Sequence, residues 1–166
     1  TGVTLWGCGH GIPEGSPPLR TVARVELERY LGVWYEIARY PHRFQEGCAD
    51  STATYTERPD GRIRVENVCR DARDGGAERR ATGVAWVAPG DPSNARLLVQ
   101  FFWPFRGEYW IIELDPDYRY AVVGHPSRDY LWILSRTPRM EEEVYRELLR
   151  RIAAHGYDLT RIQRTE

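Results

Sequence analysis

From Val25 to Arg136, apolar and polar residues alternate in short stretches, which is the period of a strand with one buried face. Glycine, proline and aspartate interrupt the alternation repeatedly, and these residues favour tight turns. The pattern predicts eight strands, at residues 34–40, 51–57, 62–70, 79–88, 96–103, 108–115, 118–124 and 130–136. No helical pattern separates them, so an antiparallel meander is expected. A meander of eight strands can close into an up-and-down barrel, which leaves no exposed edge.

One helix is predicted after the last strand, because the period of the apolar residues changes there. They recur every four positions, at Val144, Leu148 and Ile152. Thr137 can cap the start of this helix and Gly156 can end it. A single apolar stripe predicts that the helix packs on the outside of the barrel. Residues 157–163 are then expected to return as a short ninth strand.

The first 24 residues do not share this pattern and are predicted to form a flexible tether in front of one domain at 25–166. Glycine, proline and serine are frequent over residues 9–18. Cys8 follows a small residue, as does the lipidated cysteine at the end of a bacterial lipoprotein signal. One interpretation is therefore that Cys8 carries a lipid anchor that attaches the chain to a membrane. The alternative is an unstructured terminus with an incidental thiol.

Charge and histidine spacing exclude several classes of function. The formal net charge is −1 at pH 7 and the cations are scattered along the chain, so nucleic acid is not an expected partner. No apolar run reaches the roughly 18 residues that a membrane-spanning helix needs. The histidines are His10, His42, His125 and His155. They do not have metal-ligand spacing with one another or with the cysteines, so neither a metal nor a cofactor is expected.

Three motifs in order resemble the signatures of the lipocalin family. Residues 32–36, Gly-Val-Trp-Tyr-Glu, follow a helical turn at 27–31 and resemble the Gly-x-Trp motif. Asp129-Tyr130 and the stretch 132–138 resemble the two later signatures. The resemblance is strongest to bacterial outer-membrane lipoprotein lipocalins and to apolipoprotein D. It implies an all-β fold, an eight-stranded antiparallel barrel with a C-terminal helix outside, that carries an apolar ligand.

Trp34 and Arg136 are expected to close one end of this barrel. A tryptophan at the start of the first strand supplies a large flat plug. An arginine at the end of the last strand can lie across its ring, a contact that contributes about 0.5 to 2 kcal/mol when partly desolvated. We predict structural roles for both residues and for Gly32 of the motif.

Alternation along the strands identifies the side chains that face a ligand. From Trp34 and Arg136 it places inside the barrel Glu36, Ala38, Tyr130, Trp132 and Leu134. The resemblance to apolipoprotein D sets the parity elsewhere and adds Tyr55, Val65, Asn67, Val99, Phe101, Tyr109, Ile111, Ala121 and Val123. Such an aromatic and aliphatic lining suits a ligand with a long apolar body and one polar end, a fatty acid or lysophospholipid. Glu36 is unusual, since a buried carboxylate is costly unless it is hydrogen-bonded or neutral.

Cys48 and Cys69 are expected to form a disulfide. Folding the second and third strands about the turn at 59–61 brings the two thiols near each other. A disulfide indicates an oxidising compartment, either the cell envelope, with the protein as an outer-membrane lipoprotein facing the periplasm, or the exterior. A few lipocalins are isomerases that use a cysteine inside the barrel. Pairing would remove that nucleophile, so no enzymatic activity is expected.

Two other functions remain open from the sequence. The same aromatic lining could hold a tetrapyrrole or another planar ligand. Alternatively, the barrel is packed solid and the protein is an interaction module, with the aromatic residues at 102–105 as its partner surface. A homodimer is a further partner that the sequence allows.

Overall fold

The stretches of alternating apolar and polar residues form strands, and the predicted turns separate them. The computed structural model describes residues 15–102 and 105–166. Its strands are β1 (Gly32–Arg39), β2 (Cys48–Glu57), β3 (Ile63–Asp71), β4 (Ala77–Val87), β5 (Arg96–Phe102), β6 (Phe105–Leu114), β7 (Tyr120–Gly124), β8 (Leu131–Ser135) and β9 (Gln163–Arg164). The helices are α1 (Leu27–Tyr30) and α2 (Glu142–Ala154), and short 3-10 turns are η1 (Arg43–Gln45), η2 (Ala72–Asp74) and η3 (Leu159–Arg161).

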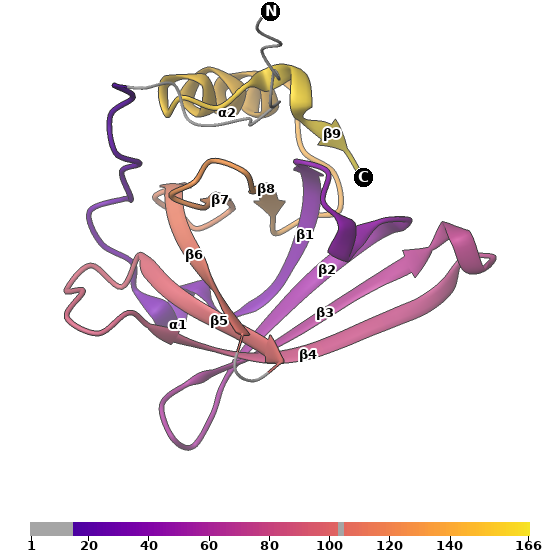
Figure 1. Cartoon of the computed structure of the whole chain (residues 1–166), viewed down its shortest axis with the longest axis horizontal. Coiled ribbons are helices and arrows are strands. Elements are labelled where there is room, and N and C mark those ends of the chain that lie inside the picture. Colours follow the sequence, from indigo (N-terminus) through magenta and orange to yellow (C-terminus); the bar gives the residue numbers. More distant parts are fainter. Residues whose placement is uncertain (1–14, 103–104) are drawn as a thin grey trace, which may run out of the picture.

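The first eight strands close into an antiparallel barrel (Figure 1), which confirms the predicted fold class. Each strand from β2 to β7 pairs with the next in the chain. β1 pairs with β8 on one side and with β2 on the other, and these two ladders complete the ring. The short strand β9 joins the later part of β1.

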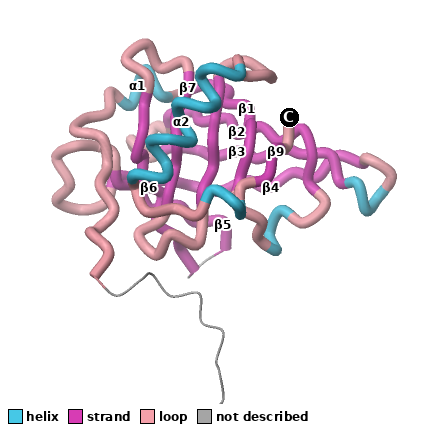
Figure 2. Tube along the Cα trace, turned by 90° about the horizontal axis from the view of Figure 1, so that it is seen from above, coloured by secondary structure: helices cyan, strands magenta, loops and turns pink. Residues whose placement is uncertain are grey.

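Helix α2 packs outside the barrel, as its apolar stripe predicts (Figures 1 and 2). Its buried side chains are Tyr145, Leu148 and Ile152. They share a cluster with residues on the outer faces of four strands, Ile37, Ile112, Val122, Leu131 and Ile133. The outward residues of these strands are therefore apolar as well as the inward ones.

Two boundaries near the C-terminus differ from prediction. The helix begins at Glu142 rather than just after Thr137. Thr137 does not cap it, because the hydroxyl of Thr137 donates to the carbonyl of Arg139 in a local turn. The ninth strand, expected at 157–163, is shorter and later, at Gln163–Arg164. The Asp158 carboxylate accepts from the backbone N–H of Thr160 and stabilises a 3-10 turn in the expected range.

Part of the predicted tether is packed on the barrel. Leu19 is 4% exposed and belongs to the cluster beneath α2. The backbone N–H of Val22 donates to the carbonyl of Ile111 on β6 at 3.0 Å. Leu19 and Val22 thus pack this segment against the barrel wall. Cys8 and the rest of residues 1–14 lie outside the described residues.

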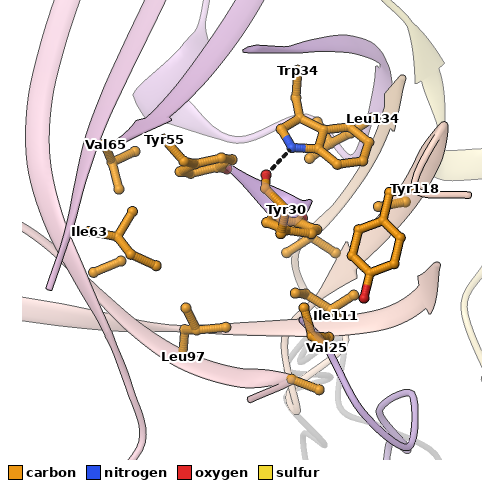
Figure 3. Close-up of a cluster of buried hydrophobic side chains, with 14 residues drawn as sticks. Val25, Tyr30, Trp34, Tyr55, Ile63, Val65, Leu97, Ile111, Tyr118 and Leu134 are labelled. Carbon is orange, nitrogen blue, oxygen red and sulfur yellow. Dashed lines mark hydrogen bonds between the residues drawn. The ribbon is translucent and has the colours of Figure 1, made fainter. Parts of the chain in front are cut away.

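One end of the barrel is closed by the predicted pair. The guanidinium carbon of Arg136 lies 3.8 Å from the centre of the Trp34 ring, and Trp34 is completely buried. Arg136 also donates to the carbonyls of Arg29, Val33 and Tyr118. The Trp34 indole donates to the carbonyl of Tyr30 in α1 (Figure 3). Gly32 has a φ of 99°, and a Cβ there would lie 3.4 Å from Arg136 Nη1, so glycine suits this approach.

The predicted disulfide is present. Cys48 and Cys69 are bonded, with their Cα atoms 5.4 Å apart. They tie the start of β2 to the end of β3, close to the register in which Cys48 faces Asp71. The bond lies toward the end of the barrel opposite Trp34. We call this the open end.

Candidate functional site

Most of the predicted ligand residues lie on the inner face of the barrel. They belong to one connected apolar cluster, part of which is drawn in Figure 3. The members that were predicted are Tyr55, Val65, Val99, Phe101, Tyr109, Ile111, Ala121, Val123, Trp132 and Leu134. Asn67 is half-buried two residues beyond Val65 on β3, where alternation also turns it inward.

The placement of Ala38 inside the barrel is wrong. The register between β1 and β8 shifts between Glu36 and Ala38, where β1 has an extra residue. Such a bulge reverses the alternation that follows it. Ala38 therefore joins the cluster beneath α2, and Arg39 takes the position facing Trp132 in the ladder. Period two alone cannot reveal an extra residue in a strand.

A chain of three tyrosines crosses the barrel. The hydroxyl oxygen of Tyr109 lies 2.8 Å from that of Tyr55 and 2.8 Å from that of Tyr30. Tyr55 is on β2 and Tyr109 is on β6, four strands away around a ring of eight, so the two rings approach from opposite walls. Tyr30 rises from α1 at the closed end. The chain therefore forms a floor across the barrel.

The tyrosine hydroxyls are neutral. Burial raises the pKa of Tyr55 to about 12, and burial also raises the pKa of Tyr30 and of Tyr109. The three hydroxyls carry three protons, but only two hydrogen bonds join them, and each bond uses one proton. Among the described residues, one proton thus remains without an acceptor in this chain. Tyr30 was not predicted, because period two does not apply in a short helical turn.

Exposure increases along the strands from the closed end to the open end. On β5, Leu97 is 4% exposed, whereas Val99 and Phe101 are only partly buried. Exposure also rises from Tyr55 to Ala53 on β2 and from Leu134 to Trp132 on β8. The closed half is filled by residues such as Val25, Trp34 and Ile63, which Figure 3 shows together. An accessible apolar surface therefore lies above the tyrosine floor.

A buried ion pair lies at the open end. Arg39 Nη1 donates to Glu36 Oε2 at 2.6 Å, and both side chains are at least nine-tenths buried. The Glu36 carboxylate also accepts from the amide of Gln45 and from the hydroxyl of Thr165. Arg39 donates in addition to the carbonyls of Gln45 and Cys48. The cost expected for a buried Glu36 is thus offset by three donors, in agreement with the polar network that its position requires.

Gln45 joins this ion pair to the inner wall. Its side-chain oxygen accepts from the Trp132 indole at 2.9 Å and from His42 Nε2 at 2.6 Å. Its side-chain nitrogen donates to Glu36 at 2.9 Å. Gln45 belongs to η1, in the loop that connects β1 and β2. Because a loop has no period, its role could not be derived from the sequence pattern.

Aromatic rings surround the His42 side chain. Its ring centre lies 5.5 Å from that of Trp132 and 5.7 Å from that of Tyr130. Tyr130 and Trp132 are stacked at 6.0 Å, so Tyr130 is at the rim of the inner face. Burial lowers the pKa of His42, which favours the neutral imidazole. The rim is therefore aromatic on this side, and its histidine adds no charge.

Neither metal chemistry nor a spanning helix has support in the described part of the chain. Residues 15–102 and 105–166 hold no group of three or more His, Cys, Asp or Glu side chains placed to bind a metal ion. No helix in those ranges is long and apolar enough to cross a membrane. Residues 103–104 of the predicted partner surface lie outside the described residues.

Comparisons with known proteins agree with this arrangement. Residues 25–166 match the family described as a lipocalin-like domain. The chain is 45% identical to the outer membrane lipoprotein Blc of Escherichia coli over 88% of this chain and 82% of that protein. It is 41% identical to temperature-induced lipocalin-1 of Arabidopsis thaliana over 89% of this chain and 82% of that protein. Apolipoprotein D of Rattus norvegicus is 31% identical over 89% of this chain and 78% of its own length.

A solved structure shares the fold. Insecticyanin from the tobacco hornworm Manduca sexta superposes with a TM-score of 0.74, covering 93% of this chain and 87% of its own. The sequences are 19% identical, so this similarity concerns the fold alone.

Proposed function

This chain belongs to the lipocalin family, and from that premise we propose that it carries a fatty acid or lysophospholipid in the open half of its barrel. Lipocalins bind and transport hydrophobic ligands. The finer choice of ligand is supported by the shape and chemistry of the inner face. An alkyl chain is long, narrow and apolar, as is the surface above the tyrosine floor.

The observation that carries the proposal is the gradient of exposure on β2, β5 and β8. A barrel packed solid would bury its inner residues along the whole strand. Here Ala53, Val99 and Trp132 stay accessible while Tyr55, Leu97 and Leu134 are buried. Burial of apolar surface contributes about 25 cal/mol per Å², so an alkyl chain lying on these residues gains affinity from each methylene. This gradient disfavours the filled-barrel interaction module.

The polar groups fit an amphiphile with its head at the open end. The chain would pass over Val99, Phe101 and Trp132, and the head would stay near solvent at the rim formed by Tyr130. Asn67 and the free tyrosine proton offer hydrogen bonds deeper in the barrel. The Arg39 guanidinium is paired with Glu36, so it is not free to take an anionic head.

No chemistry on the ligand is proposed. Cys48 and Cys69, the cysteines of the described residues, are bonded to each other and offer no nucleophile. The pKa of His125 is lowered by burial, and its Nδ1 is engaged by Ser127 within a single turn. A nucleophile and base that serve a substrate converge from separate elements. The proposal is therefore a carrier.

We also propose a location in the cell envelope. The disulfide fits an oxidising compartment, and the relative from Escherichia coli is an outer membrane lipoprotein. Attachment through a lipid on Cys8 would place the barrel mouth near the membranes that supply its ligand. Labelling with a radioactive fatty acid in vivo would detect this anchor, and an unlabelled protein would refute it.

Titration with a fluorescent fatty acid tests the carrier function. Saturable binding with micromolar or tighter affinity is expected, and native mass spectrometry should find a fatty acid or lysophospholipid on the purified protein. A folded barrel that binds neither would refute the proposal. Visible absorption by the purified protein would instead indicate a planar chromophore such as a tetrapyrrole.

A further inference from the structure

The barrel wall is split between β4 and β5 toward the open end. β3 and β4 pair continuously from Ile63↔Ala85 to Asp71↔Ala77. β4 and β5 pair only from Val87↔Leu97 to Val84↔Gln100. Within the described strands, residues 77–83 of β4 therefore have no ladder partner on β5.

Phe101 lies at this split. It follows Gln100, the last β5 residue that pairs with β4. On the other side of β5, the ladder with β6 is irregular between Val99 and Phe102. The backbone at Phe101 thus lacks regular pairing on both sides. Segments with few ladder hydrogen bonds open at lower free energy than the strands around them.

The Phe101 ring covers the split because β4 has a glycine beside it. A Cβ at Gly83 would lie 2.8 Å from Cδ1 of Phe101 and 2.7 Å from the carbonyl oxygen of Gln100. Any side chain at this position would displace the ring. The glycine therefore leaves room on β4 for the Phe101 ring to pack against its backbone.

A hollow of about 420 Å³ opens on this part of the wall. Its lining residues are Arg58, Arg64, Thr82, Gly83, Val84, Gln100 and Phe101. Phe101 is also a member of the interior cluster. A single ring is therefore shared by the hollow and by the inside of the barrel.

The chemistry of the hollow suits a hydrocarbon tail rather than a charged head. Arg58 is paired with Asp60 at 2.9 Å, and Arg64 is paired with Glu66 at 2.9 Å. Each cation thus already has a carboxylate partner. The methylene stems of these arginines can cover an alkyl chain together with Val84 and Phe101.

We propose that Phe101 is a side gate in the barrel wall, through which the tail of a long single-chain amphiphile passes into the hollow. This inference rests on the carrier function proposed above and specifies its ligands. The floor formed by Tyr55 and Tyr109 limits the length of chain that the open half can hold. A longer chain leaves beside Phe101, so the gate determines chain-length specificity.

Affinities for saturated fatty acids from decanoic to docosanoic acid test the gate in three variants. Phe101→Ala removes the ring and should improve the affinity ratio of docosanoic to decanoic acid by about threefold or more. Phe101→Trp enlarges it and should lower that ratio. Val99→Ala, on the same strand but away from the hollow, should weaken every chain length by a similar factor. An unchanged ratio in both Phe101 variants would overturn the gate.

A measurement on the unaltered protein removes dependence on the folding of the variants. With a ¹³C label at the tail end of docosanoic acid, isotope-filtered nuclear Overhauser spectra should show contacts to the methyl groups of Val84, which lines the hollow. The same label on decanoic acid should show contacts to Val65 inside the barrel and none to Val84. Contacts to Val65 alone with both acids would refute the gate and leave the carrier function intact. If neither acid binds, the carrier function itself fails.

Discussion

The hydroxyl oxygens of Tyr55 and Tyr109 lie 2.8 Å apart, although β2 and β6 stand on opposite sides of the barrel. Their contact divides the interior into two parts. Below it, Trp34, Val25 and Ile63 fill the closed half. Above it, Val99 and its neighbours remain accessible. A barrel of this strand number can be filled by side chains or hold one small ligand. Here the closed half below the tyrosine floor is filled, and we propose that the open half above it holds the ligand.

Tyr109→Phe should destabilise the fold by about 1 to 3 kcal/mol. The substitution leaves the buried hydroxyls of Tyr30 and Tyr55 without the partner that they share, which costs more than the loss of one contact. Tyr55→Phe is the matched control, since it removes one contact and keeps the other. Urea midpoints measure both. A Tyr109→Phe variant as stable as the parent would show that the floor contributes nothing to stability.

Arg136→Ala should lower the free energy of unfolding by about 1 to 3 kcal/mol and leave ligand affinity per folded molecule unchanged. The guanidinium covers the Trp34 ring and satisfies three carbonyls at the closed end, below the ligand surface. Arg136→Lys keeps the charge but cannot reproduce the flat, forked contact, so it should be intermediate. Equal denaturation midpoints in the three proteins would contradict this role.

Trp132→Phe should weaken fatty acid binding several-fold while the barrel stays folded. The change trims the inner wall and removes the hydrogen bond from the indole to Gln45. Trp132→Ala would lose a contact of about 60 Å², worth roughly 1.5 kcal/mol or about tenfold in affinity, and phenylalanine retains part of it. Trp110→Phe is a useful control, because Trp110 packs against the cluster beneath α2, outside the barrel. Unaltered affinity and chain-length preference in Trp132→Phe would show that this residue does not line the site.

Gln45→Met should speed ligand exchange more than it changes equilibrium affinity. Methionine has a similar length but cannot bond to Trp132, His42 or Glu36, so the loop that contains η1 loses its attachment to the inner wall. Stopped-flow association and dissociation rates should both rise. If both rates match those of the parent, the Gln45 hydrogen bonds do not restrain access to the barrel.

Stability should fall as the pH drops below about 6.5, and His42 should contribute to this loss. Burial lowers the pKa of His42 in the folded chain from its ordinary value of 6.5, so the unfolded chain binds the proton first as the pH falls. His42→Gln should therefore lose less stability between about pH 7.5 and about pH 5.5. His125, whose pKa burial also lowers, provides a second variant with the same sign. Identical pH slopes in the parent and both variants would contradict this linkage.

The sequence predicts those parts of the fold that repeat. Period two located the barrel strands, and the hairpin register brought Cys48 and Cys69 together. The family resemblance paired Trp34 with Arg136. The sequence pattern could not locate the bulge that turns Ala38 outward, because an extra residue leaves no mark in the alternation. The roles of Gln45 and Tyr30, which lie in a loop and a helical turn, depend on hydrogen bonds to residues distant in the sequence. Only the folded structure shows these contacts.

The central claim is that the open half of the barrel, above the tyrosine floor, holds the ligand. Isotope-filtered nuclear Overhauser spectra of the protein with ¹³C-labelled palmitic acid test it most directly. We predict contacts from the alkyl chain to the methyl groups of Ala53 and Val99, and none to Val25 or Ile63 in the closed half. Contacts only to outer residues such as Val122 and Leu148, or the absence of a saturable complex, would contradict it.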